Sequence, residues 1–154
     1  MFRKSATLAV AVLLAALASG SSASAAQQRL EVQLEPGFFI TERDGIWYGS
    51  DYVSYNEFTV RAKAPHGRGN VRLFLSLPHQ IHVLGHEGDG WTCRDVTGGI
   101  ECDHHRPIAP GAEWPTLLVR IDPDCERTIR DSFDAYADGN HHFGVPFICY
   151  PTGT

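Results

Sequence analysis

The chain has 154 residues, of which 13 are lysine or arginine and 18 are aspartate or glutamate, and its formal net charge is −5. This length fits one domain and leaves no room for a second enzyme lobe. The acidic balance argues against a nucleic acid or an anionic membrane surface as the partner.

The first 25 residues have the pattern of a secretory signal. Arg3 and Lys4 precede an apolar run over 6–18, and small residues follow up to Ala25. We expect a signal peptide over residues 1–25 and a single domain over 26–154, which keeps 11 basic and all 18 acidic residues, a net charge of −7. The apolar run is short for a membrane span and no stretch of eighteen apolar residues follows. The sequence therefore predicts a secreted, extracellular protein with no membrane insertion.

The mature part begins with alternating apolar and polar residues, the period of a strand with one buried face. The pattern covers 30–34, returns over 58–64 and again over 71–77, and the last two runs are separated by the turn residues of 65–70. We expect those two runs to form a hairpin-like unit. Ile81 and Val83 predict a further short strand.

The segment from Trp91 to His104 predicts a β-hairpin around Gly98-Gly99. With a four-residue loop over 96–99, Arg94 faces Glu101 and Cys93 faces Cys102. This register places opposite charges across the strands and brings the cysteines within disulfide range. In an exported chain with four cysteines, we expect Cys93 bonded to Cys102 and, by exclusion, Cys125 bonded to Cys149.

The last third is less clear in its pattern. A strand is expected over 116–121, whereas Ile129, Phe133 and Tyr136 also suit a short amphipathic helix. We favour a strand that turns at 138–140, because 143–149 then returns beside it and brings Cys149 toward Cys125. The region from Phe38 to Tyr55 is rich in aromatic residues and interrupted by glycine, and no pattern places its strands.

Seven or so short strands separated by Gly/Pro turns predict an all-β fold, namely an immunoglobulin-like, two-sheet antiparallel β-sandwich with two disulfides. Residues 77–121 also carry a set of motifs: Leu-Pro, then Gly-Trp-Thr-Cys, Gly-Gly, a second Cys, Ile-Ala-Pro-Gly and Leu-Val-Arg-Ile. The region from Phe58 to Ile121 resembles the conserved repeat domain of secreted and cell-wall proteins of Gram-positive bacteria. The resemblance implies an immunoglobulin-like fold and an extracellular setting, and it brings no catalytic residue.

Histidine is the residue type that most suggests chemistry, and eight are present: His66, His79, His82, His86, His104, His105, His141 and His142. Adjacent histidines on a strand point to opposite faces, so the two His-His pairs cannot share one metal site in full. We interpret the histidines as solvent-exposed residues at strand ends. No nucleophile elbow and no calcium-loop motif is present, and we expect no catalytic residue, no metal and no cofactor.

An aromatic group, Trp47, Tyr48, Tyr52 and Tyr55, is the candidate partner-binding site, because loop aromatics of a sandwich can anchor a partner. Packing in the core is the alternative role for such residues. The sequence thus favours a secreted, non-enzymatic binding or adhesion module whose partner is an extracellular protein or a cell-wall polymer. The alternatives are an inhibitor or small-ligand carrier, and then a histidine-dependent metal-binding protein or enzyme.

Overall fold

The structure, a computed structural model, describes residues 30–50 and 54–151; the expected signal over 1–25 lies outside them. All regular elements of this part are strands, and it holds no apolar helix of the length that a bilayer crossing requires. The strands are β1 (Glu31–Pro36), β2 (Thr41–Arg43), β3 (Ile46–Ser50), β4 (Asn56–Lys63), β5 (Val71–Ser76), β6 (Ile81–Glu87), β7 (Trp91–Val96), β8 (Gly99–His104), β9 (Leu117–Pro123), β10 (Ile129–Ala137) and β11 (Asn140–Tyr150).

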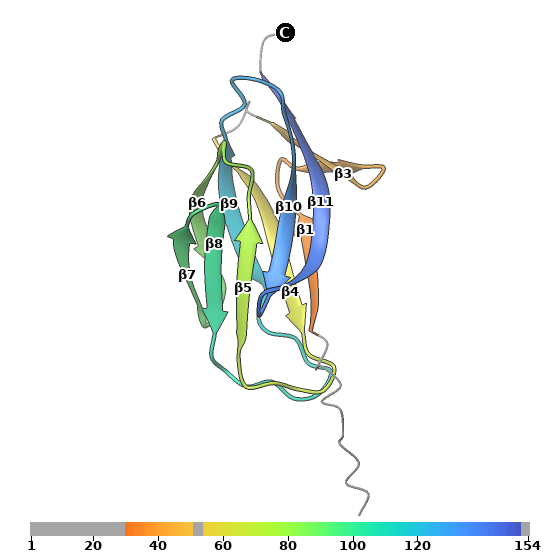
Figure 1. Cartoon of the computed structure of the whole chain (residues 1–154), viewed down its shortest axis with the longest axis vertical. Coiled ribbons are helices and arrows are strands. Elements are labelled where there is room, and N and C mark those ends of the chain that lie inside the picture. The colour runs from red at the N-terminus through yellow and green to blue at the C-terminus, as the bar shows by residue number, and fades with distance from the viewer. Residues whose placement is uncertain (1–29, 51–53, 152–154) are drawn as a thin grey trace, which may run out of the picture.

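The strands form two sheets that pack face to face (Figure 1). One sheet has the order β1-β4-β9-β6 and the other β2-β3-β11-β10-β5-β8-β7. The four strands of the first sheet face the three central strands of the second, β11, β10 and β5. Four strands packed on three is the arrangement of immunoglobulin domains. The hairpin β7–β8 extends the edge at β5, and β2–β3 extends the edge at β11. The predicted immunoglobulin-like sandwich is confirmed, with one exception to antiparallel pairing: β3 runs parallel to β11.

The expectation of a hairpin from 58–64 and 71–77 is wrong. β4 pairs with β1 and β9 in the first sheet, whereas β5 pairs with β10 and β8 in the second. The loop between β4 and β5 therefore crosses from one sheet to the other. Both strands bury one face against the same core, so each shows the alternation that a hairpin would also show.

The hairpin β7–β8 has the predicted register. Cys93 lies opposite Cys102 with a Cα–Cα distance of 4.1 Å, and the two are disulfide-bonded. The Arg94 guanidinium contacts the Glu101 carboxylate across the strands at 2.9 Å. The turn is tighter than expected, because Val96 already pairs with Gly99 and only two residues remain in the loop.

The last third forms the predicted strand pair, β10 and β11, joined by Asp138 and Gly139. Both turn residues have positive φ, 49° and 80°, as a two-residue type I′ turn requires. The strand pairing places Ile129 opposite Cys149, and Cys149 is bonded to Cys125 as predicted. The helical alternative for this segment is thereby excluded.

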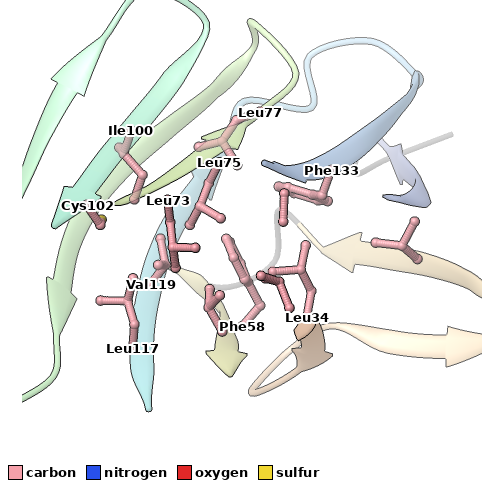
Figure 2. Packing of buried hydrophobic residues seen from close by; sticks show 14 of the residues in the cluster. Leu34, Phe58, Leu73, Leu75, Leu77, Ile100, Cys102, Leu117, Val119 and Phe133 are labelled. Atoms are coloured by element: carbon pink, nitrogen blue, oxygen red, sulfur yellow. The ribbon is translucent and has the colours of Figure 1, made fainter. Parts of the chain in front are cut away.

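The core lies between the inner faces of the two sheets, as Figure 2 shows for Phe58, Leu73 and Val119. Its largest side chains form an aromatic cluster that joins the layers. The Phe58 ring, from the first sheet, lies 5.3 Å from the Phe133 ring of the second. The rings of Trp47 and Phe147 contact Phe133 at 5.8 Å and 4.7 Å. Burial of these rings stabilises the contact between the sheets.

Candidate functional site

The four aromatic residues proposed for partner binding are separated by the fold. Trp47 is 1% exposed, so its assignment as a partner contact is wrong. Pairing of β3 with β11 sets Trp47 opposite Phe147 and turns the indole inward. Tyr48 points to the opposite side of β3 and is half-buried, and Tyr52 lies outside the described residues. Tyr55, half-buried just before β4, is the member that reaches a surface site.

Tyr55 belongs to a surface cluster with two phenylalanines that the sequence prediction missed. The Phe39 ring meets the Tyr55 ring edge-on at 5.9 Å, and the Phe38 ring lies 6.0 Å from that of Phe39. Phe38 is 67% exposed and Phe39 is 46% exposed. We call this cluster, Phe38, Phe39 and Tyr55, the aromatic turn, because its two phenylalanines form the turn between β1 and β2.

Backbone hydrogen bonds hold the aromatic turn against β4. The Gly37 N–H donates to the Glu57 carbonyl at 2.9 Å, and the Glu57 N–H donates to the Phe38 carbonyl at 3.0 Å. A Cβ on Gly37 would lie 2.8 Å from the Glu57 carbonyl oxygen, so only glycine permits this approach. The Ile40 N–H closes the turn onto the Gly37 carbonyl at 3.4 Å. The position of both phenylalanines is thus fixed by the main chain.

Phe39 has a φ of 62°, in the left-handed region. As third residue of a four-residue turn it occupies the position that favours glycine or asparagine. A bulky side chain in this conformation costs on the order of 1 kcal/mol or more. Core packing does not account for this conformation, since the Phe39 ring is 46% exposed and lies outside the core cluster. Strained backbone that presents an exposed aromatic ring is typical of a functional position.

A buried amide lies beside the aromatic turn. Asn56 is fully buried; its Oδ1 accepts from the Ser50 N–H at 3.0 Å and its Nδ2 donates to the Ser50 carbonyl at 2.7 Å. This pair of bonds joins the end of β3 to the start of β4. Because Asn56 directly follows Tyr55, these two hydrogen bonds also help to position the tyrosine.

Charged groups border the aromatic turn on the outer face of the first sheet. The Arg120 Cζ lies 6.0 Å from the centre of the Tyr55 ring. The same guanidinium contacts the Glu87 carboxylate at 2.7 Å and the Glu57 carboxylate at 3.4 Å. The hydrogen bond to Glu87, with the charges of Glu87 and Glu57, raises the pKa of Arg120 above its usual value. The turn therefore has an apolar centre and a charged rim on one side.

The histidines do not converge on a metal site. No group of three or more His, Cys, Asp or Glu side chains is placed to hold a metal ion in residues 30–50 and 54–151. The interpretation of all histidines as exposed is wrong for His104, which is 1% exposed and lies edge-on to the Trp91 ring at 5.2 Å. Its neighbour His105, which follows the end of β8, is exposed.

A serine, an aspartate and a histidine do meet on the outer face of the second sheet. The Asp134 carboxylate lies between the other two: it accepts from Ser132 Oγ at 2.6 Å and contacts His141 Nε2 at 2.9 Å. In a hydrolase triad the histidine stands between the serine and the acid. Here the acid takes that place, so the arrangement does not activate the serine.

Known proteins resemble this chain only in their structure. No known family and no curated protein matches the chain. Among solved structures, the chain is similar to a non-cellulosomal cohesin from the hyperthermophilic archaeon Archaeoglobus fulgidus, with 13% sequence identity and a TM-score of 0.49. The similarity covers 79% of this chain and 92% of the cohesin chain.

Proposed function

We propose that the chain is a secreted, non-enzymatic binding module that engages an extracellular protein through the aromatic turn. The observation that carries this proposal is the exposure of Phe38 and Phe39 together with the positive φ of Phe39. Two exposed phenylalanines cost solubility, and the left-handed backbone costs stability. A partner that buries both rings offsets these costs.

The surroundings of the turn support a protein as the partner. Aromatic side chains with an arginine are the residue types that dominate binding energy in protein interfaces. Arg120, beside Tyr55, is held by two carboxylates and so is positioned before a partner arrives. Main-chain hydrogen bonds to β4 likewise fix the turn, so little further ordering is needed on binding.

The proposal places the module outside the cytoplasm, in the setting that the Gram-positive repeat domain implies. The two disulfides support this, because such bonds persist in oxidising compartments. A hydrolytic or metal-dependent activity has no support from the described residues, in which the Ser-Asp-His group has the wrong order and the histidines are dispersed.

The test is capture of partners on the immobilised mature protein from the secreted and cell-wall fractions of its source organism. We expect a protein that binds the unaltered module and is lost from the double variant Phe38→Ser, Phe39→Asn, since asparagine tolerates the left-handed backbone. Leu84→Ser is the matched control: this leucine is 54% exposed but lies on β6, at the far edge of the same sheet from β1.

Retention by the double variant would contradict a role for the aromatic turn. Capture of cell-wall polymer without any protein would contradict the proposed class of partner. A photoreactive phenylalanine analogue at position 38 should cross-link the same protein, which verifies direct contact.

A further inference from the structure

A groove lies where β1 begins and β10 turns into β11. These strand ends are at the other end of the sandwich from the aromatic turn (Figure 1). It has a volume of about 980 Å³, at the upper end of the range for ligand sites. β1 forms one wall with Glu31 and Gln33, and the start of β11 forms the other with Asn140 and His142. The groove therefore opens between the edges of the two sheets.

Three polar side chains in this groove have no partner among residues 30–50 and 54–151. In the described part of the chain, no side-chain hydrogen bond or ion pair joins Glu31, Gln33 or His142 to another residue. Together they present a carboxylate, an amide and an imidazole, so both acceptors and donors are available. Unused groups of both kinds along one groove suit a ligand that also carries both.

The charged side chains of Arg68 and Asp138 in the groove lining balance each other. The Arg68 guanidinium, from the loop between β4 and β5, contacts the Asp138 carboxylate at 2.6 Å. Because these two charges neutralise each other, Glu31 is the one lining residue with an uncompensated formal charge in this part of the structure. A strongly anionic ligand gains no free cation here, and no metal cluster is present among the described residues.

An aromatic ring completes the lining. Phe143, in β11, is half-buried against the core and borders the groove, with the apolar side chains of Leu30 and Val32 nearby. An apolar ring surface beside a few hydrogen-bonding groups is the usual composition of a small-ligand site. The ligand must then have an apolar face and several uncharged donors and acceptors.

We propose that this groove binds a neutral oligosaccharide. A sugar ring has a C–H face that can pack on Phe143 and hydroxyl groups that both donate and accept, which matches Glu31, Gln33 and His142. The groove volume of about 980 Å³ has room for more than one sugar ring. The inference goes beyond the proposed protein-binding function, and because β1 separates the two sites, either can fail without the other.

The test uses the mature protein labelled with ¹⁵N and a panel of neutral oligosaccharides that includes cellohexaose, chitohexaose and mannohexaose. We expect saturable amide shifts at 31–33 and 140–143 with one or more of these probes. Gln33→Ala and His142→Ala should each weaken that binding about tenfold, the effect of losing one hydrogen bond to the ligand. Their thermal midpoints should stay unchanged, since neither side chain has a hydrogen-bond or ion-pair partner among the residues that the structure describes.

Glu42→Ala is the control, because Glu42 is an exposed acid on β2, outside the groove. The proposal is overturned if no neutral oligosaccharide shifts these amides, or if only charged glycans or peptides do so. Binding that both groove variants retain in full would overturn it as well.

Discussion

His104 shows how the fold accommodates a polar side chain that is nearly inaccessible to solvent. Its Nδ1 accepts from the Arg106 N–H at 3.2 Å, and its Nε2 lies 3.0 Å from the Asp89 carbonyl, which can only accept. The imidazole must therefore carry its proton on Nε2. Gly90 leaves room for it, because a Cβ there would lie 2.7 Å from Nε2.

Replacing His104 by leucine should destabilise the domain more than its size suggests. The change keeps the buried volume but leaves the Arg106 N–H and the Asp89 carbonyl without their partner. We expect His104→Leu to lower the free energy of unfolding by about 2 kcal/mol. Urea denaturation measures this. His105→Ala is the control, and the exposed neighbour should change stability by less than about 0.5 kcal/mol; equal losses for both would contradict the structural role of His104.

In contrast to His104, Phe39 should tolerate replacement without loss of stability. Glycine adopts positive φ without strain, so Phe39→Gly should leave the free energy of unfolding unchanged or raise it by up to about 1 kcal/mol. Phe38→Gly, next to it and not at positive φ, should lower stability by about 0.5–1 kcal/mol. Thermal unfolding of both variants decides the matter, and a comparable loss in both would show that the Phe39 backbone is not strained.

Among the strands, the pairing of β7 with β8 was the one that the sequence predicted best. Opposite charges at Arg94 and Glu101 and two cysteines limit the register to one solution. The sequence could not predict which strands share a sheet. Alternation of apolar and polar residues indicates that one face of a strand is buried, but it does not identify the neighbouring strand. β4 and β5 illustrate this: their neighbours come from distant parts of the chain.

The candidate site was predicted in part, through Tyr55 alone. Asp44-Gly45, at φ of 53° and 72°, is a two-residue turn signal that would have placed the β2–β3 hairpin. Phe38 and Phe39 follow Pro36-Gly37 as consecutive aromatics, and such neighbours cannot both point into one core. The strained backbone at Phe39 depends on hydrogen bonds between the turn and β4. These bonds join distant parts of the chain, so the local sequence pattern could not predict them.

Gly99 governs the contact of the β7–β8 hairpin with β5. A Cβ at this position would overlap the Leu75 carbonyl oxygen, which belongs to the neighbouring strand. Gly99→Ala should therefore disturb the β5–β8 pairing and lower the free energy of unfolding by about 3 kcal/mol. Gly98→Ala, in the same turn but with nothing within 4 Å, should cost only about 1 kcal/mol for its positive φ. Denaturation midpoints that do not separate the two variants would contradict this close approach.

For the whole molecule, the two disulfides close loops of different length. Cys125–Cys149 spans a sequence separation of 24 and Cys93–Cys102 one of 9. Loop-closure entropy assigns them about 3.5 and about 2.7 kcal/mol. We expect the Cys125→Ala, Cys149→Ala variant to lose more stability than the Cys93→Ala, Cys102→Ala variant, because the hairpin register already holds the shorter loop. Guanidinium denaturation compares them, and the reverse order would contradict this reasoning.

The course of the outer strands also determines how the domain carries a pulling force. β1 begins at one end of the sandwich and β11 finishes at the other (Figure 1), so tension along the long axis runs parallel to both. Antiparallel ladder bonds lie perpendicular to their strands, so this tension loads the β1–β4 and β10–β11 ladders in shear and does not open them bond by bond. Cys149, one residue before the end of β11, is tied to Cys125, and the chain between them cannot lengthen while that bond persists. Under tension along this axis we therefore expect the domain to extend little before its ladders break.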